Sequence, residues 1–196
     1  MVALSDSVIQ VRNANSVIIY VSIGTNFVNY KDISADPESR AFTALNVKKS
    51  YEKSRQAHID TYQKQIGTVS LDLGQTDQMH KPTDVRIAEF NATFDPDLVA
   101  TYFQLGRYLL ISSSQPGGQP ANLQGIWNEK RYAPWDGKFA NDINLEMNYW
   151  PAEITNQSAQ HVPVVDLGKN LSRQGRESAR MYGCEGWTVH HFTDIW

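Results

Sequence analysis

The sequence predicts a mainly α-helical chain with a small β part. Alternating β-branched residues are concentrated near the N-terminus, in residues 16–27 (SVIIYVSIGTNF). Most later segments instead carry apolar residues at helical spacing behind good helix starts. With 41% hydrophobic and 20% charged residues, the composition is that of a folded globular protein. At 196 residues the chain is long enough for one domain or for pieces of two.

The N-terminal segment is predicted to be the edge of a sheet. Residues 8–11 are the expected hairpin partner of a half-buried strand over residues 16–27. Four residues of that strand would share its buried face: Val17, Ile19, Val21 and Ile23. Two strands do not form an independent domain. Residues 1–28 are therefore expected to be the last strands of a larger sheet.

Residues 29–94 are predicted to be a connecting segment with helices and one short strand. Residues 29–40 are polar and turn-like, a helical pattern begins at about Pro37, and Gly67 stops the second helical stripe. The expected elements are, in order, a helix from about Pro37, a helical stripe of residues ending at Ile66, a strand over residues 68–73 (TVSLDL), a loop over residues 75–83 and a helical turn over residues 84–90.

Residues 95–196 are predicted to be helices joined by rich loops. Asp95-Pro96-Asp97 is a strong helix start, because it combines a capping carboxylate, a proline at the first helical position and an acid facing the helix dipole. Arg107 lies within the apolar stripe of this helix, and we expect it to anchor a buried carboxylate or carbonyl rather than to contact a substrate. The expected helices run from Asp95 to about Ser112–Ser114, from Ile143 to about Thr155, and from about Val164 to Tyr182.

The stretch of residues 119–153 has the composition of a sugar site. It contains three of the five tryptophans (Trp127, Trp135 and Trp150) among asparagines, carboxylates, glycines and prolines. Flat aromatic faces accept the C–H side of a pyranose, and amides and carboxylates pair with hydroxyl groups. A loop at the edge of the core with satisfied amides explains the composition equally well. Trp135 is the better platform, because Pro134 holds it out on a loop.

Three amide side chains in the same stretch are further candidates for binding hydroxyl groups. Asn122 and Gln124 either bind hydroxyls or tie the loop together. Asn148 follows Asn144 by one helical turn and shares its face.

Three separated segments carry a resemblance to a known family: QPANLQGIWN, NDINLEMNYWPAE and, at the C-terminus, HHFTDIW. Together they resemble the start of the catalytic domain of glycoside hydrolase family 95, the inverting α-1,2-L-fucosidases with some α-L-galactosidases. The clearest similarity covers residues 95–196. The resemblance implies the beginning of an (α/α)6 barrel over residues 95–196, a helical linker over residues 29–94, and a preceding β-sandwich that ends in residues 1–28.

The resemblance also implies catalytic roles at the start of the helix from Ile143. In the family an Asn-x-Asn motif holds the attacking water, a distant Asp polarises the amide, and a Glu is the general acid. The motif falls on Asp142-Ile143-Asn144, so Asn144 would position the water and Asp142 replaces the first Asn. Three roles are open for Asp142. It would accept hydrogen bonds from the sugar hydroxyls or the water, act directly as the base, or weaken the charge balance of the site. A helix N-cap is the structural alternative for Asp142.

The C-terminal segment HHFTDIW lines the sugar pocket by the same resemblance. His191, Asp194 and Trp196 are therefore binding candidates, and Phe192 stands where the family usually has Asn. A zinc site is not expected, because adjacent histidines point in different directions and Cys184 is not at a usual ligand spacing. No cofactor is implied.

Charge and hydropathy exclude several partner classes. The net charge is −3 and no stretch is dense in Lys and Arg, which disfavours a nucleic-acid partner. No run of about 18 apolar residues is present, so no membrane span is expected. The expected ligand is a fucosylated oligosaccharide or glycan, with no obligate protein partner. Enzymes of this family meet external glycans, which suggests the periplasm, the cell surface or secretion.

The same resemblance predicts that the chain is an internal fragment. The family's general-acid Glu and its polarising Asp correspond to positions beyond Trp196, and an (α/α)6 barrel needs twelve helices. Little or no hydrolase activity is therefore expected from this polypeptide alone. Two rival functions remain open: an α-L-galactosidase of the same family, and a non-catalytic carbohydrate-binding module that uses Trp127, Trp135 and Trp150 as platforms.

Overall fold

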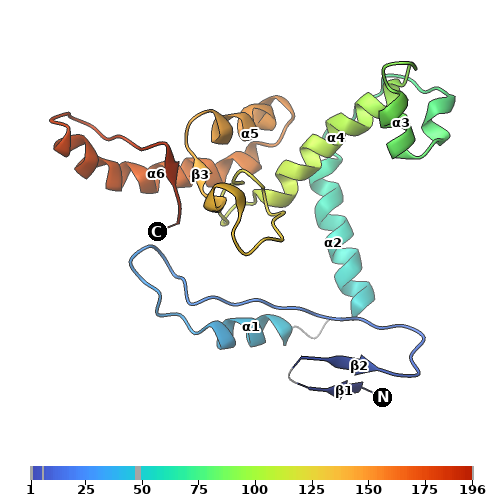
Figure 1. Ribbon diagram of the computed structural model, residues 1–196, viewed down its shortest axis with the longest axis horizontal. Coiled ribbons are helices and arrows are strands. Elements are labelled where there is room, and N and C mark those ends of the chain that lie inside the picture. The colour runs from blue at the N-terminus through green and yellow to red at the C-terminus, as the bar shows by residue number, and fades with distance from the viewer. Residues whose placement is uncertain (1, 6, 47–49, 196) are drawn as a thin grey trace. The chain divides into compact units, whose positions relative to one another are not determined.

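The computed structural model of the chain describes residues 2–5, 7–46 and 50–195 (Figure 1). Its α-helices are α1 (Pro37–Leu45), α2 (Tyr51–Ile66), α3 (Thr83–Glu89), α4 (Pro96–Ser113), α5 (Ile143–Ile154) and α6 (Ser158–Met181). Short 3-10 turns are η1 (Asp77–His80) and η2 (Pro134–Gly137). The strands are β1 (Val2–Leu4), β2 (Ile9–Val11), β3 (Phe139–Ala140) and β4 (Phe192–Thr193). The prediction of a mainly helical chain with a small β part is confirmed.

Contacts divide the chain into two compact units, Met1–Ile59 with Ile195–Trp196 and Asp60–Asp194. Helix α2 begins in the first unit and ends in the second. The predicted domain boundaries after residues 28 and 94 stay predictions. None of the helices in the described ranges combines the length and the apolar character that a membrane span requires.

The strand predicted over residues 16–27 is wrong. β2 pairs antiparallel with β1, not with that segment, and residues 16–27 contain no strand. Two of the residues expected on its buried face, Val21 and Ile23, are 79% and 86% exposed. An alternating pattern forms a strand only when a partner takes up its backbone groups. Within the described part of the first unit, no strand pairs with this segment.

Helix α1 begins where the sequence predicts. The Asp36 side chain accepts hydrogen bonds from the amides of Glu38 and Ser39, and Pro37 occupies the first helical position. From the same helix, Arg40 Nη1 donates to the carbonyl oxygens of Thr25 and Phe27 at 2.8 and 2.7 Å. These contacts hold the preceding loop against α1.

The segment between α2 and α3 is a loop, so the strand predicted over residues 68–73 is wrong. The carbonyl oxygen of Val69 accepts hydrogen bonds from Arg107 Nη1 at 3.1 Å and from Gln104 Nε2 at 3.0 Å. Because side chains of α4 use this acceptor, it is not available to a β-ladder. The loop expected over residues 75–83 contains the 3-10 turn η1, and the helical turn expected over residues 84–90 is α3.

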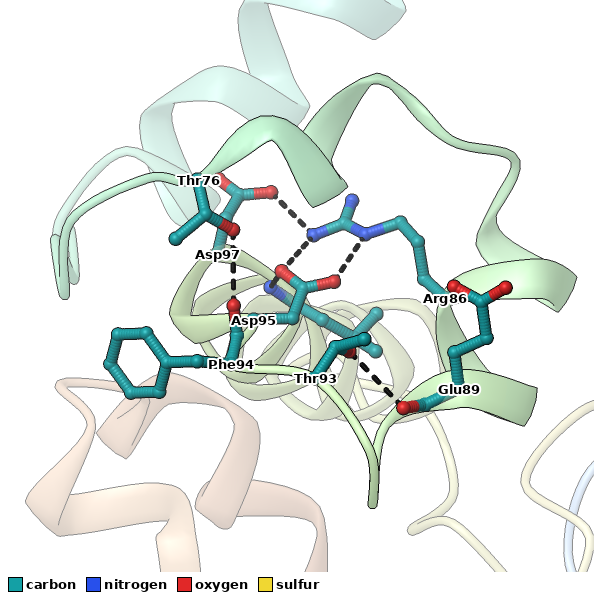
Figure 2. A network of polar contacts seen from close by, with 8 residues as sticks. Thr76, Arg86, Glu89, Thr93, Phe94, Asp95 and Asp97 are labelled. Atoms are coloured by element: carbon teal, nitrogen blue, oxygen red, sulfur yellow. Dashed lines mark hydrogen bonds and ion pairs between the residues drawn. The ribbon is translucent and has the colours of Figure 1, made fainter.

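A buried ion network joins α3 to the start of α4 (Figure 2). Asp95 caps α4 by accepting the Leu98 amide at 3.1 Å. Arg86 donates to both oxygens of Asp95 at 2.8 Å, and the two side chains are only 7% and 0% exposed. Arg86 Nη2 also lies 2.9 Å from Asp97 Oδ2. The predicted Asp-Pro-Asp helix start is therefore confirmed, and its carboxylates also bind α3.

This network predicts a loss of stability in acid. The hydrogen bonds from Arg86 lower the pKa of Asp95 below its ordinary value. A carboxyl whose pKa is lower in the folded state stabilises the fold above its unfolded pKa, about 3.9, and loses that contribution as pH falls through the folded value. We expect the urea midpoint, followed by far-ultraviolet circular dichroism, to fall steeply below about pH 4. Asp95→Asn should flatten this dependence.

The surface pair of Asp166 and Lys169 provides the matched control for this measurement. Their side chains are 51% and 65% exposed and lie 2.9 Å apart within α6. Asp166→Asn should keep the acid dependence of the unmodified chain. If Asp95→Asn also kept it, the network would not be the cause.

The core of the second unit fixes the loop before α5 against α4 and α6. Tyr149 of α5 is 5% exposed, and its hydroxyl accepts the Ala121 amide at 2.6 Å. The same hydroxyl donates to Ser114 Oγ at 2.8 Å, and Ser114 Oγ donates to the Gln160 carbonyl at 2.7 Å. Burial raises the pKa of Tyr149, so its hydroxyl stays protonated as a donor. The apolar neighbours in this core are Leu110, Ala121, Leu145, Ala152 and Val164.

Helix α6 begins at Ser158, six residues before the predicted start at Val164. Pro163 therefore lies inside the helix, where a proline normally costs one backbone hydrogen bond. It is also among the largest fully buried side chains. We attribute the earlier start to this burial, which offsets the lost bond.

Candidate functional site

Two segments far apart in the sequence meet at a short ribbon. β3 and β4 pair antiparallel, with Phe139 opposite Thr193 and Ala140 opposite Phe192. Asn141 extends the ribbon: its backbone amide donates to the His191 carbonyl at 2.8 Å, and its Nδ2 donates to the His190 carbonyl at 2.9 Å. The residues before α5 and the segment HHFTD are thus held side by side.

The return of the chain to this ribbon depends on a glycine in α6. A Cβ atom at Gly175 would lie 2.2 Å from the carbonyl oxygen of Thr188. The Thr188 amide donates to the Gly175 carbonyl at 3.1 Å. Only glycine allows the C-terminal segment to approach α6 this closely.

Asp142 faces His191 across the ribbon. It occupies the N-cap position of α5, but its side chain accepts no capping hydrogen bond. Asp142 Oδ2 instead lies 3.2 Å from His191 Nδ1, with the two side chains 50% and 56% exposed. The helix-cap explanation is therefore wrong for the carboxylate of Asp142.

Two aromatic rings lie next to this pair. The ring of Phe192 lies 4.1 Å from that of His191, edge to face, and 5.9 Å from that of Trp135 at an angle of 33°. We call Trp135, Asp142, His191 and Phe192 the ribbon cluster. It combines a flat aromatic face with a carboxylate and an imidazole.

Trp135 is presented by an unusual backbone. It lies in η2 with φ +56°, and Asp136 follows with φ +57°. Non-glycine residues rarely adopt this left-handed region, and such strain is frequent at functional sites. The indole is 69% exposed. A large apolar side chain held outward on a strained turn is available to a ligand.

A second group of predicted residues lines a cavity of about 320 Å³ between α4, the loop after it and α5. The ring of Trp127 lies against Gly125, where an added Cβ would approach Trp127 Cζ3 to 2.8 Å. The ring of Tyr108 is 6.3 Å away. These contacts fix Trp127 as one wall. The predicted site residues that line this cavity are Asn122, Gln124, Trp127 and Asn148.

The three amides of this cavity also tie its loop together. Asn122 Nδ2 donates to the Gly137 carbonyl at 2.7 Å, and Asn122 Oδ1 accepts a hydrogen bond from the backbone amide of Gln124 at 2.9 Å. Gln124 Nε2 donates to the Pro134 carbonyl at 3.0 Å, and Asn148 Nδ2 to the Asn122 carbonyl at 3.1 Å. The cavity loop is thereby connected to the turn that carries Trp135.

Two amide oxygens in this region are buried without a hydrogen-bond partner among the described residues: Gln124 Oε1 and Asn141 Oδ1. A buried acceptor without a donor costs free energy. Asn141 was not among the predicted site residues, because its bonds to His190 and His191 leave no local pattern in the sequence.

The remaining predicted site residues lie outside the ribbon cluster and do not line the cavity. Asn144 is exposed in the first turn of α5, and its side chain has no hydrogen bond within the described residues. Trp150 is 60% exposed, and Asp194 is half-buried. Trp196 lies outside the residues that the structure describes. Within the described ranges, no group of three or more His, Cys, Asp or Glu side chains is arranged to hold a metal ion.

Comparison with known proteins gives one family. Residues 50–196 match the catalytic domain of glycosyl hydrolase family 95. The chain is 37% identical over 206 residues to Alpha-L-fucosidase 2 of Arabidopsis thaliana, covering 99% of this chain and 24% of that protein. It is 34% identical over 203 residues to Probable alpha-fucosidase A of Aspergillus oryzae, covering 95% of this chain and 28% of that protein. The chain thus spans about a quarter of the length of these curated relatives.

Proposed function

Because this chain belongs to glycosyl hydrolase family 95, we propose that it forms part of an exo-acting glycosidase that removes terminal α-1,2-linked L-fucose from glycans with inversion. In this proposal residues 95–196 begin an (α/α)6 barrel, residues 29–94 are its linker, and residues 1–28 end a β-sandwich. The single observation that carries the proposal is the ribbon, which brings the segment with Asp142 and Asn144 to the segment HHFTD.

The ribbon cluster supports a sugar as the ligand. Trp135 and Phe192 offer an aromatic surface for the apolar face of a pyranose. Asp142 lies at the edge of that surface, 3.2 Å from His191 Nδ1, and its carboxylate would accept hydrogen bonds from sugar hydroxyl groups. The cavity of Trp127, Asn122, Gln124 and Asn148 lies one loop away and would take a neighbouring sugar residue.

Inverting hydrolysis needs an attacking water on one face of the sugar and an acid at the other. The water oxygen bonds to the anomeric carbon and gives up a proton to the base, an amide assisted by a carboxylate, while the glycosidic oxygen leaves with the acid's proton. We assign Asn144 to the water, with Asp142 accepting hydrogen bonds from the sugar or the water. The general acid and the carboxylate that polarises Asn144 would come from the part of the relatives' length that this chain does not span. No cofactor is needed, because water is the only co-reactant.

The proposal is tested by expressing both this chain and the longer protein that would contain it. The longer protein should release fucose from an α-1,2-fucosyl galactoside, and proton NMR should detect the β anomer first. The 196-residue chain alone should show little or no turnover. Faster turnover of an α-L-galactoside would instead indicate an α-L-galactosidase. Glycan binding without turnover in the longer protein would indicate a binding module.

Removing the aromatic platform should weaken substrate binding. Trp135→Ala is expected to raise KM for the fucosyl substrate about tenfold, since loss of a well-packed aromatic anchor costs about 1–2 kcal/mol. The change in kcat should be smaller, because Trp135 contacts no reacting atom in this proposal. Steady-state kinetics of the longer protein would measure both constants.

Tyr132 provides the control for this substitution, because it lies on the same loop and is 80% exposed. It is outside the ribbon cluster, so Tyr132→Ala should leave KM near that of the unmodified protein. An equal rise in KM in both variants would contradict a specific platform at Trp135.

A further inference from the structure

Asp142 and His191 are brought together by backbone contacts that do not depend on their side chains. Asn141 donates from its amide and its Nδ2 to the carbonyls of His191 and His190. The next residues back, Phe139 and Ala140, are paired with β4. The main chain near both positions is therefore held in place independently of the contact between the carboxylate and the imidazole.

The contact between the two side chains contributes little to the fold. Both are at least half exposed, and exposed ion pairs add little stability because water screens them. Asp142 also gives up the helix-capping bond that its position would allow. A carboxylate that neither caps its helix nor stabilises the core is available for another purpose.

The imidazole is held in one orientation by its neighbours. Its ring lies edge to face on Phe192, whose ring in turn lies near that of Trp135. His191 Nδ1 lies 3.2 Å from Asp142 Oδ2, and a favourable contact at this distance requires a proton on Nδ1. His191 therefore engages one carboxylate oxygen and leaves Oδ1 as an acceptor.

We propose that His191 is a positioning residue that orients Asp142, so that Oδ1 is presented to a sugar hydroxyl or to the water beside Asn144. This inference rests on the proposed function. It gives His191 a different role from the direct contact with sugar that the family resemblance implies. It also accounts for an Asp at a position where the family usually has Asn, because a carboxylate can accept from the imidazole and from the ligand at the same time.

Kinetics of the longer protein distinguish positioning from direct binding. His191→Ala should lower kcat about 10- to 100-fold, as small misplacements of a reacting site do, with little change in KM. His191→Asn should recover most of this loss, because its Nδ2 donor lies close to the place of Nδ1. In an Asp142→Ala background, His191→Ala should have no further effect. A rise in KM that is the same in both backgrounds would overturn the proposal.

A second measurement reads the pair without activity. In ¹⁵N-histidine-labelled protein at mildly alkaline pH, where imidazoles are neutral, the ¹⁵N shifts show which ring nitrogen carries the proton. His191 is identified by the signals lost in His191→Asn. In the unmodified protein we expect the ring proton of His191 on Nδ1. In Asp142→Ala we expect that proton on Nε2 instead. An unprotonated Nδ1 in the unmodified protein would disprove the pair, whereas an intact pair in a protein without fucosidase activity would disprove the proposed function instead.

Discussion

Replacing Asn144 with alanine is expected to lower kcat of the longer protein about 10³-fold, the middle of the range for a group that activates the reacting water. In the proposed mechanism the Asn144 amide holds the attacking water against the anomeric carbon, and alanine leaves that water without an orienting partner. KM should change little, because the water is not part of the substrate. The test is a comparison of both constants on an α-1,2-fucosyl galactoside.

The loss should come from chemistry and not from unfolding. Asn144 is exposed in the first turn of α5, and its side chain has no hydrogen bond within the described residues. The midpoint of thermal unfolding should therefore stay close to that of the unmodified protein. Asn170, an exposed asparagine of α6, is the matched control, and Asn170→Ala should keep kcat. If Asn144→Ala kept kcat within about threefold, less than a general acid or base contributes, Asn144 would not hold the water.

The helix starts could be predicted from the sequence because their signals are local. Asp36-Pro37 and Asp95-Pro96 each place a capping carboxylate and a proline within two residues, and both begin helices in the structure. The predictions of strands over residues 16–27 and 68–73 are wrong for the opposite reason. Alternation describes one strand, but a strand forms only with a partner that the pattern does not name.

The candidate site was predictable only in part. Composition selected residues 119–153, and Trp135 does lie exposed on its turn. The contact of Asp142 with His191 could not be predicted, because it depends on β3 pairing with β4 and on the close approach at Gly175. Similarly, the side chains of Asn122 and Gln124 make hydrogen bonds within the loop itself. Composition alone cannot distinguish this structural role from ligand binding.

Arg107 is a charged residue within the apolar stripe of α4. A charged side chain in an apolar helical stripe must find acceptors, and the structure supplies carbonyl oxygens, as predicted. Arg107 is 2% exposed, and burial lowers the pKa of its guanidinium. The guanidinium remains charged, as arginine does in proteins. Its acceptors are the carbonyls of Gln65, Ile66, Val69 and Thr155, together with Thr68 Oγ1 and Gln104 Oε1.

Arg107→Ala is therefore expected to lower the free energy of unfolding of the chain by about 3 kcal/mol, the cost of leaving several buried acceptors without donors. The acceptors lie at the end of α2, in the loop after it and at the end of α5, so one substitution should loosen all three. Urea unfolding followed by far-ultraviolet circular dichroism would measure the change.

Two further variants show whether this loss comes from the hydrogen bonds of the guanidinium. Arg107→Lys keeps the charge but cannot reproduce the planar set of donors, so it should recover only part of the loss. Arg173→Ala, at an exposed position of α6, should change the free energy by less than about 0.5 kcal/mol. If Arg107→Lys were as stable as the unmodified chain, charge alone would be sufficient. The convergence of six acceptors on one guanidinium would then not be what joins α2, α4 and α5.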